Sequence, residues 1–332
     1  MQVGIFLATQ WPEGADLGSA VADLAAQVRA AKDSGFASVW VGQHYLTGPL
    51  RMLQTGPLLA RLAVEGEGMT FGSAIYLVPM QSPVALAEEV ASLDWITGGR
   101  MVLGAGMGYR AEEFEAMGVP FAERIGRFQE SLELIRRLWR EPTVEHRGRH
   151  FTVPGLGASI MPKQPGGPPI WIGAEVPASV RRAARLGDAW FAPPTVTFDA
   201  TAELLGHYRQ ARAAEGLPPA TAQPLIRECA IGATRAQALA VARGPLLYKY
   251  ESYASWGQLD SAGSGGLKDI FDDFMAARFI VGDEAEVADA LARHRDALGV
   301  DHMILRLQWP GLPQAEVMDA IQRLGRVVAR LR

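Results

Sequence analysis

The stretch GGRMVLGAGMGYRAEEF, residues 98–114, decides the fold, because it runs from an apolar strand through alternating glycines into a helix. Gly104, Gly106 and Gly108 allow the backbone to approach a ligand closely. The N–H groups at the start of the following helix can bind a phosphate. Tyr109 stands where the dinucleotide-binding fingerprint has a glycine, so the stretch is not that motif. It predicts a strand-to-helix turn that can bind an anion, and a tight turn without a ligand is the alternative.

The same unit recurs along the chain as short apolar runs separated by stretches with helical periodicity, which is typical of parallel strands joined by crossover helices. The predicted strands are Val3–Ala8, Ser38–Gln43, Met69–Leu77, Met101–Ala105, Pro169–Ala174, Ala189–Pro193, Leu225–Gly232 and His302–Leu307. The predicted helices are Leu17–Ser34, Pro83–Ile96, Phe121–Trp139, Pro177–Leu186, Ala200–Glu215, Glu284–Leu298 and Pro313–Leu331. Eight such units predict an α/β chain folded as a closed (β/α)8 TIM barrel, a single domain over residues 1–332. An open doubly wound sheet is the alternative, but such a sheet usually divides into two domains at this length, and the sequence has no linker of that kind.

Two stretches fall outside this repeat. Residues 143–168 follow the fourth helix and contain several glycines, which predicts a hairpin and a loop. Residues 244–273, rich in Tyr, Ser and Gly around Trp256, lie between the seventh strand and the eighth. Long excursions in a compact barrel usually serve as lids or binding loops, so this second stretch is the candidate lid. A disordered surface insertion is the alternative, because residues 261–266 have almost no apolar side chains.

The composition indicates a soluble globular protein. The chain has 332 residues, 48% of them hydrophobic, a formal net charge of −4 and one cysteine. Cys229 lies in an apolar run, so we expect a buried thiol in a reducing compartment and no disulfide. The charges form no basic stripe for nucleic acid. No stretch is apolar enough to span a membrane, and residues 3–8 are too short for a signal peptide, so a cytoplasmic protein is expected.

Side chains that carry chemistry are expected at the carboxyl ends of the strands. His44 follows the second strand, where it can exchange a proton at neutral pH or hydrogen-bond a reactive oxygen species. A loop histidine satisfied by the backbone is the alternative. His146 and His150 are four residues apart but lack the helical Glu of a metalloprotease, so no metal is assigned.

The chain also offers places for a flat ring, a phosphate and a substrate. Small residues in the third strand leave room for a ring against the backbone at Ser73, Ala74 and Ile75. The turns after the fourth and fifth strands compete for the phosphate and supply Gly106, Met107, Gly108, Tyr109, Gly173, Ala174, Glu175 and Ser179. Residues at or near other strand ends are candidates for the substrate pocket, namely Gln43, Trp190, Arg227 and Trp309.

Two hydrolase classes fit poorly. A glycosidase needs two carboxylates at strand ends, and Glu175 qualifies, whereas Glu228 falls inside its predicted strand. A serine hydrolase of the α/β type needs a Gly-x-Ser-x-Gly elbow, which the sequence lacks.

Several motifs, in their order and spacing, resemble the bacterial luciferase-like flavin-dependent monooxygenase superfamily over nearly the whole chain. They are Trp40–His44, Ala74–Ile75 with Leu77 and Pro79, Asp94, Gly99–Arg100, Gly108–Tyr109, Glu113–Phe114, Gly118, Pro168–Gly173, Arg278–Gly282 and His302–Leu305.

The resemblance implies a (β/α)8 barrel, usually dimeric, that binds reduced FMN or the deazaflavin coenzyme F-420 at the carboxyl ends of its strands. It also implies that His44 is functional and that the peptide bond between Ala74 and Ile75 is cis behind the flavin ring. Residues 107–109 and 175–179 match the regions that bind the cofactor phosphate. Many relatives have Glu where this chain has Gln43, and some have Arg where it has Met107, which leaves the phosphate to backbone N–H groups, Ser179 and Arg110.

The function that the resemblance favours is a monooxygenase that uses reduced FMN and oxygen to oxygenate a small organic substrate. Because the chain has no nicotinamide fingerprint, a separate NAD(P)H:flavin reductase is the expected source of reduced FMN. An F-420-dependent hydride-transfer oxidoreductase is one alternative, and a non-catalytic flavin-binding subunit is another. A homodimer is expected, and the apolar stretch Leu58–Leu62 would pack either on a partner subunit or on the barrel.

Overall fold

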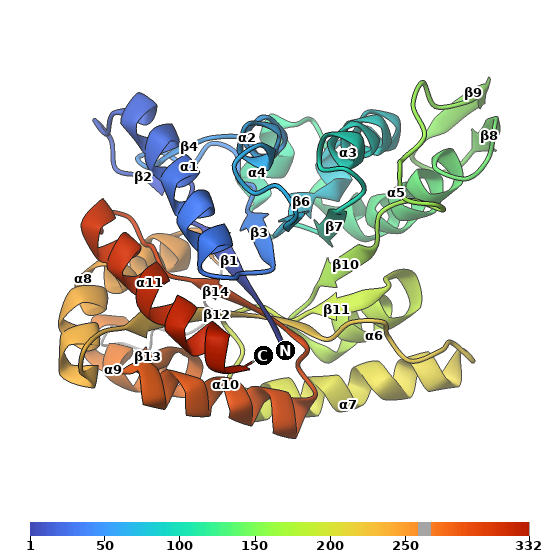
Figure 1. Cartoon of the computed structure of the whole chain (residues 1–332). Coiled ribbons are helices and arrows are strands. Elements are labelled where there is room, and N and C mark those ends of the chain that lie inside the picture. The colour runs from blue at the N-terminus through green and yellow to red at the C-terminus, as the bar shows by residue number, and fades with distance from the viewer. Residues whose placement is uncertain (258–266, 332) are drawn as a thin grey trace.

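The computed structural model describes residues 1–257 and 267–331, and its centre is a curled sheet of parallel strands (Figure 1). In spatial order the strands are β11 (Ala189–Phe191), β10 (Ile170–Gly173), β7 (Met101–Gly106), β5 (Thr70–Ser73), β3 (Ser38–Val41), β1 (Gln2–Leu7), β14 (His302–Arg306), β12 (Pro224–Ile231) and β13 (Ile280–Gly282). A parallel bridge from Ala192 to Leu225 links the segment after β11 to β12. Each predicted strand overlaps one of these strands, an arrangement consistent with the expected barrel.

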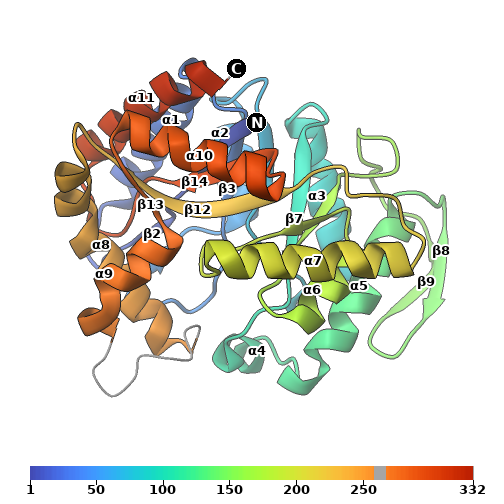
Figure 2. The same ribbon diagram turned by 90° about the horizontal axis from the view of Figure 1, so that it is seen from below.

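Helices surround the curled sheet, and most of them lie along its outer face (Figures 1 and 2). They are α1 (Leu17–Asp33), α2 (Thr55–Ala63), α3 (Pro83–Ile96), α4 (Ala111–Ala116), α5 (Arg124–Leu138), α6 (Pro177–Leu186), α7 (Phe198–Ala214), α8 (Arg235–Ser255), α9 (Leu267–Arg278), α10 (Glu284–Leu298) and α11 (Gln314–Leu331). Local signals set their ends: Asp283 and Glu286 form a capping box at the start of α10, and Gly299, with φ of 72°, ends it. Leu58, Leu59 and Leu62 of α2 are buried in the core of this chain.

The interior of the curled sheet is filled by aromatic side chains. Trp40 is fully buried and stacks on Trp171 with ring centroids 4.9 Å apart, while Phe191 meets both rings edge-on. A Cβ on Gly72 would lie 2.2 Å from the Trp40 ring, so only glycine fits beside it. Because these aromatic rings fill the interior of the sheet, space for a ligand lies closer to the carboxyl ends of the strands.

Short strands lie outside the main succession. β6 (Tyr76–Leu77) pairs with β7, and the peptide bond between Ala74 and Ile75, which joins β5 to β6, is cis. β2 (Gln10–Trp11) pairs with β4 (Arg51–Met52). Within residues 143–168, β8 (Val144–Arg147) and β9 (Thr152–Leu156) form an antiparallel hairpin that projects from the molecule (Figure 1).

The stretch 244–273 differs from its prediction. Residues 244–255 belong to α8 and residues 267–273 to α9, so its described parts are helical, and residues 258–266 lie outside the described chain. Cys229 is buried and free, as predicted. None of the helices in the described ranges is both long and apolar enough to cross a membrane.

Candidate active site

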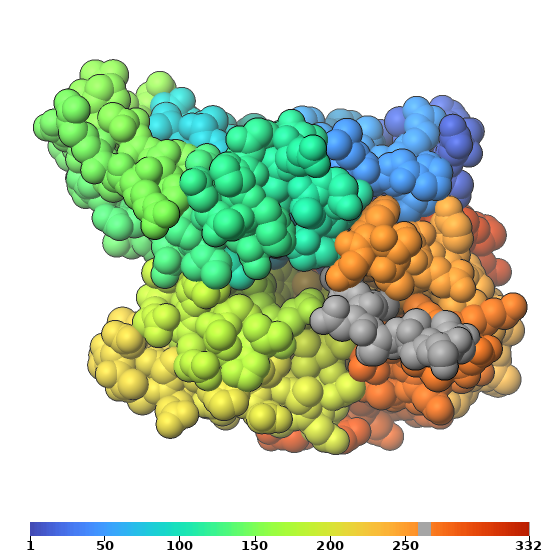
Figure 3. All heavy atoms as spheres, turned by 180° about the vertical axis from the view of Figure 1, so that it is seen from behind, coloured from blue at the N-terminus to red at the C-terminus, as the bar shows by residue number. Residues whose placement is uncertain are grey.

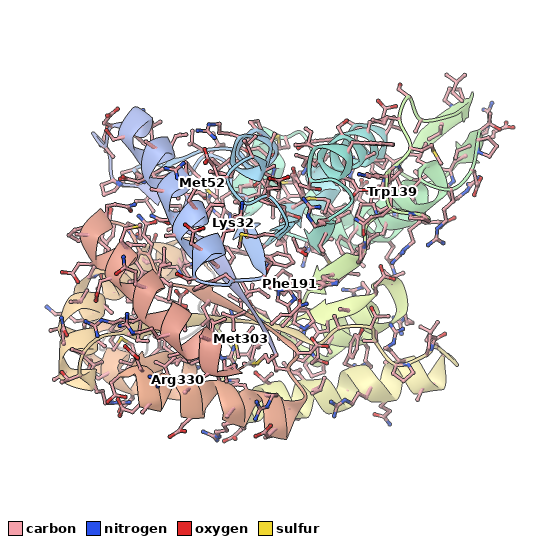
Figure 4. All side chains as sticks on the ribbon, in the orientation of Figure 1. Lys32, Met52, Trp139, Phe191, Met303 and Arg330 are labelled. Carbon is pink, nitrogen blue, oxygen red and sulfur yellow. The ribbon has the colours of Figure 1, made fainter. Side chains whose placement is uncertain are left out.

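A cavity of about 330 Å³ opens at the carboxyl ends of the strands. The surface is hollowed on one side of the molecule, where green, yellow-green and orange segments meet (Figure 3). Figure 4 labels two of the lining residues, Met52 of β4 and Phe191 of β11. The predicted site residues in the wall are Gln43, His44, Ala74, Ile75, Gly106, Met107, Gly108, Tyr109, Gly173, Ala174, Glu175 and Ser179. The turn after β3, the β5–β6 junction and the turns after β7 and β10 therefore meet around one space.

His44 is held by a carboxylate from a separate element. Its Nδ1 lies 3.1 Å from Oε1 of Glu113, a fully buried side chain on α4. The same oxygen accepts the backbone N–H of Tyr45 at 2.8 Å. With Glu113 ionised, Nδ1 of His44 carries the proton that it donates, so Nε2 is the nitrogen left to exchange a proton with a ligand. Sequence reasoning assigned no role to Glu113, although a Glu in the first turn of the helix after a glycine turn was an available signal.

Arg110 contacts the loop that carries His44. Its guanidinium donates to the carbonyl of Tyr45 at 2.8 Å and to Glu113 at 3.4 Å. It also lies over the ring of Trp256, with Cζ 4.6 Å from the ring centroid. These contacts occupy a side chain that is only 7% exposed. Arg110 is not among the residues that line the cavity, so these contacts do not support its expected role at the cofactor phosphate.

The β5–β6 junction forms an apolar platform in the cavity wall. Ile75, next to the cis peptide bond, lies against two glycines of neighbouring strands. A Cβ on Gly106 would lie 2.3 Å from Cδ1 of Ile75, and one on Gly173 would lie 3.5 Å from its Cγ2. Gly106 is thus required by the side chain of Ile75. Ser73 does not line the cavity, because its buried hydroxyl donates to the carbonyl of Gly104 at 2.8 Å.

The N-terminus of α6 faces the other end of the cavity. Ser179 caps it, since its hydroxyl accepts the N–H of Val176 at 3.2 Å and donates to the carbonyl of Val176 at 2.9 Å. Arg182, one turn further along, lies 3.5 Å from the sulfur of Met107. Burial, and then the neighbouring Arg185 and Arg124, lower the pKa of Arg182. A cation from α6 thus stands beside the turn that carries Met107 in place of Arg, and sequence reasoning missed it.

Glu175 follows β10 and reaches into the cavity. It accepts a hydrogen bond from the Thr195 hydroxyl at 2.9 Å. The surrounding protein removes water from the Glu175 carboxyl, and this desolvation raises its pKa. The hydrogen bond from Thr195 favours the charged form and so opposes the shift.

Three predicted pocket residues lie elsewhere, which corrects the sequence prediction. Trp190 is fully buried between sheet and helices and donates to the carbonyl of Ala174 at 2.9 Å. Arg227 of β12 is buried and donates to the carbonyl of Pro193 at 3.1 Å. Trp309 donates to Glu228 at 2.6 Å. Successive side chains of a strand point to opposite faces of the sheet, so Trp190 and Arg227 point away from the cavity. Trp309 is directed away from it by the turn after β14.

A charged cluster forms another part of the wall, and the sequence did not predict it. Glu228 of β12 is fully buried and accepts from Lys249 of α8, from Arg306 of β14 at 3.1 Å and from the hydroxyl of Tyr250 at 3.1 Å. Lys249, Tyr250 and Arg306 line the cavity. Burial, and then the neighbouring Arg306, lower the pKa of Lys249 to about 7. Among the described residues, no group of three His, Cys, Asp or Glu side chains is arranged to hold a metal ion.

Comparison with known proteins assigns the family. The family model described as luciferase-like monooxygenase matches residues 1–302. This chain belongs to the luciferase-like monooxygenase family. Its members include oxidoreductases and monooxygenases, in agreement with the resemblance seen in the sequence.

Individual relatives of this luciferase-like chain divide between two cofactors. The F420-dependent hydroxymycolic acid dehydrogenase of Mycobacterium tuberculosis is 30% identical over 204 residues, which cover 60% of this chain and 56% of that protein. The crystal structure of monooxygenase RslO1 from Streptomyces bottropensis aligns with 100% of this chain and 99% of its own, with a TM-score of 0.86 and 23% identity. The oxygenating constituent of 3,6-diketocamphane monooxygenase from Pseudomonas putida, in complex with FMN, covers 99% of this chain and 98% of its own, with a TM-score of 0.80 and 20% identity.

What these matches show depends on how much of each protein they cover and on the sequence identity. This luciferase-like chain spans about half the length of the curated relatives it matches, for example 46% of two of them. The two structural likenesses lie below 25% identity and show the fold. The family therefore supports a flavin-type cofactor, and the choice between FMN and F420 rests on the residues of this chain.

Proposed function

We propose that this chain is a flavin-dependent monooxygenase, a single (β/α)8 barrel domain that takes reduced FMN from a separate reductase and oxygenates a small organic substrate. The observation that carries the proposal is the Glu113-supported His44, which shares a cavity with the apolar platform at Ala74–Ile75 and the N-terminus of α6. We also propose that the protein is a homodimer located in the cytoplasm.

The residues present fit a flavin. The platform at Ala74–Ile75 is flat and apolar enough to support a ring, since Gly106 and Gly173 bring the neighbouring strands close to it. Ser179, the first N–H groups of α6 and Arg182 would hold the phosphate. When bound, reduced FMN supplies the electrons that activate oxygen.

The protein side chains supply position and proton transfer. Glu113 orients His44, whose Nε2 would hydrogen-bond the oxygen species or donate a proton to it. Tyr253 of α8 and Trp256, which follows that helix, lie with ring centroids 6.3 and 5.7 Å from the His44 ring. These aromatic rings would exclude water from the reacting atoms.

A second candidate is an F420-dependent oxidoreductase that transfers hydride without oxygen. Arg182 lies beside Met107 of the cavity wall, and Arg185 and Arg124 are near enough to lower the pKa of Arg182. Together these arginines offer more positive charge than the single phosphate of FMN requires. The deazaflavin coenzyme carries a longer acidic tail, and the additional positive charge of Arg185 and Arg124 would suit it.

Anaerobic titration with reduced FMN and, separately, with reduced F420 distinguishes the candidates, followed by admission of air and absorbance spectroscopy. The proposal expects tighter binding of reduced FMN and, after air is admitted, a transient absorbance that differs from the spectra of both reduced and oxidised FMN. Tight F420 binding without oxygen reactivity would support the second candidate. If His44→Ala causes no loss of turnover in any assay, the result would favour the third alternative, a non-catalytic flavin-binding subunit.

A further inference from the structure

The cluster around Glu228 carries more positive than negative charge whenever Lys249 is protonated. Oε1 of Glu228 accepts from Lys249, Arg306 and Tyr250, and Oε2 accepts from Trp309. Four donors therefore saturate this carboxylate. With Lys249 protonated, two cations face one anion, and one positive charge stays uncompensated.

The remaining groups packed against the cluster do not supply the missing negative charge. Burial raises the pKa of Tyr250 and of Tyr253, so both hydroxyls stay neutral. Tyr253 donates to the amide oxygen of Gln10 at 3.3 Å. Within the described residues, Nε of Arg306 is buried and has no hydrogen-bond partner. An uncompensated buried charge is costly, and a ligand of opposite charge would remove that cost.

The cluster lies in the same cavity as His44. Lys249 and Arg306 line the cavity, and Cζ of Arg306 lies 3.8 Å from the ring centroid of Phe6, another lining residue. Tyr253 connects the two groups: its ring centroid lies 5.2 Å from Nζ of Lys249 and 6.3 Å from the centroid of His44. A small molecule held by the cations would therefore extend past Tyr253 toward His44.

We propose that Lys249 and Arg306 bind the carboxylate of the substrate, so that the substrate is a small organic acid with its apolar part directed toward His44. The reaction at that apolar part rests on the proposed function, whereas the binding of the carboxylate does not. Arg306 offers a planar donor group and Lys249 a point charge, which together suit a carboxylate.

The test uses benzoate and benzamide, which share shape and differ in charge, with the full chain and isothermal titration calorimetry. We expect benzoate to bind at least tenfold more tightly than benzamide. Arg306→Gln and Lys249→Met each leave Glu228 with one cation, and both variants should lose this preference. Arg306→Lys should keep part of it. Arg243→Gln is the matched control, because Arg243 pairs with the exposed Asp272 and lies outside the cavity wall.

Two further measurements distinguish loss of the carboxylate site from unfolding and from loss of the cofactor site. Circular dichroism shows whether Arg306→Gln and Lys249→Met are folded, and titration with reduced FMN shows whether they keep the cofactor site. Equal affinity for benzoate and benzamide would overturn the proposal, and so would loss of reduced-FMN binding in folded variants, since the cluster would then serve the cofactor. Benzoate preference in a protein that shows no oxygen chemistry would uphold the carboxylate site and contradict the proposed function alone.

Discussion

Single side chains at the rim of the sheet determine what the cavity can do. Glu113 is fully buried and accepts hydrogen bonds from the N–H of Tyr45, from His44 and from Arg110. Removal of its carboxylate would leave the buried Arg110 without an ion-pair partner. We expect Glu113→Ala to lower the free energy of unfolding by about 3 kcal/mol. Urea unfolding measures this, with Glu112→Ala on the same helix as the control. Equal stability of the two variants would mean that Glu113 does not hold the His44 loop.

His302 gives the stability a pH dependence at the residue scale. It bonds the hydroxyl of Ser38 at 2.7 Å, and burial lowers its pKa to about 4. The unfolded chain, with a histidine pKa near 6.5, binds a proton before the folded chain does. His302 therefore contributes full stability above pH 6.5, and about 2 kcal/mol of it is lost between pH 7 and pH 5.

Urea unfolding of the wild type and of His302→Gln at pH 7 and pH 5 checks this expectation. The variant should lose less stability on acidification than the wild type, whereas His207→Gln, at a partly exposed site, should behave like the wild type. A wild type as stable at pH 5 as at pH 7 would contradict the argument.

At the scale of elements, helix α6 supplies the cation that the glycine turn lacks. Arg182 lies beside Met107, so Arg182→Gln should weaken FMN binding roughly tenfold and leave riboflavin binding unchanged. Fluorescence titration of both flavins measures the difference. Arg181→Gln is the control, because Arg181 is exposed on the same helix. If FMN and riboflavin lose affinity equally, Arg182 does not contact the phosphate.

Helix α8 shows where prediction from local pattern failed. The sequence predicts a lid over residues 244–273, because this stretch is rich in Tyr, Ser and Gly around Trp256 and falls outside the strand-helix repeat. In the structure Pro245 lies inside α8, and Lys249 and Tyr250 on its buried face reach the cavity. Tertiary packing outweighed the local cost of Gly and Pro within this helix.

At the scale of the whole molecule, one aromatic core unites strands from distant parts of the chain. Trp40, Trp171 and Phe191 come from β3, β10 and β11 and fill the interior together. Trp40→Ala should lower the free energy of unfolding by about 3–5 kcal/mol and destabilise all three strands at once. Hydrogen exchange and urea unfolding test this, with Trp95→Ala, which is 53% exposed, as the control. A loss of protection confined to β3 would contradict a shared interior.

The sequence by itself determined the repeat of strands and helices, the buried Cys229, the glycine turn and the position of His44 at a strand end. These features depend on periodicity and chain order, which are local properties of a sequence. Only the tertiary structure decided that Glu113 supports His44, that Arg182 stands beside Met107 and that Lys249 meets Glu228. It also turned Trp190, Arg227 and Trp309 away from the cavity. Those partners are set by the curvature of the sheet and the register of its strands, which bring distant residues to one rim.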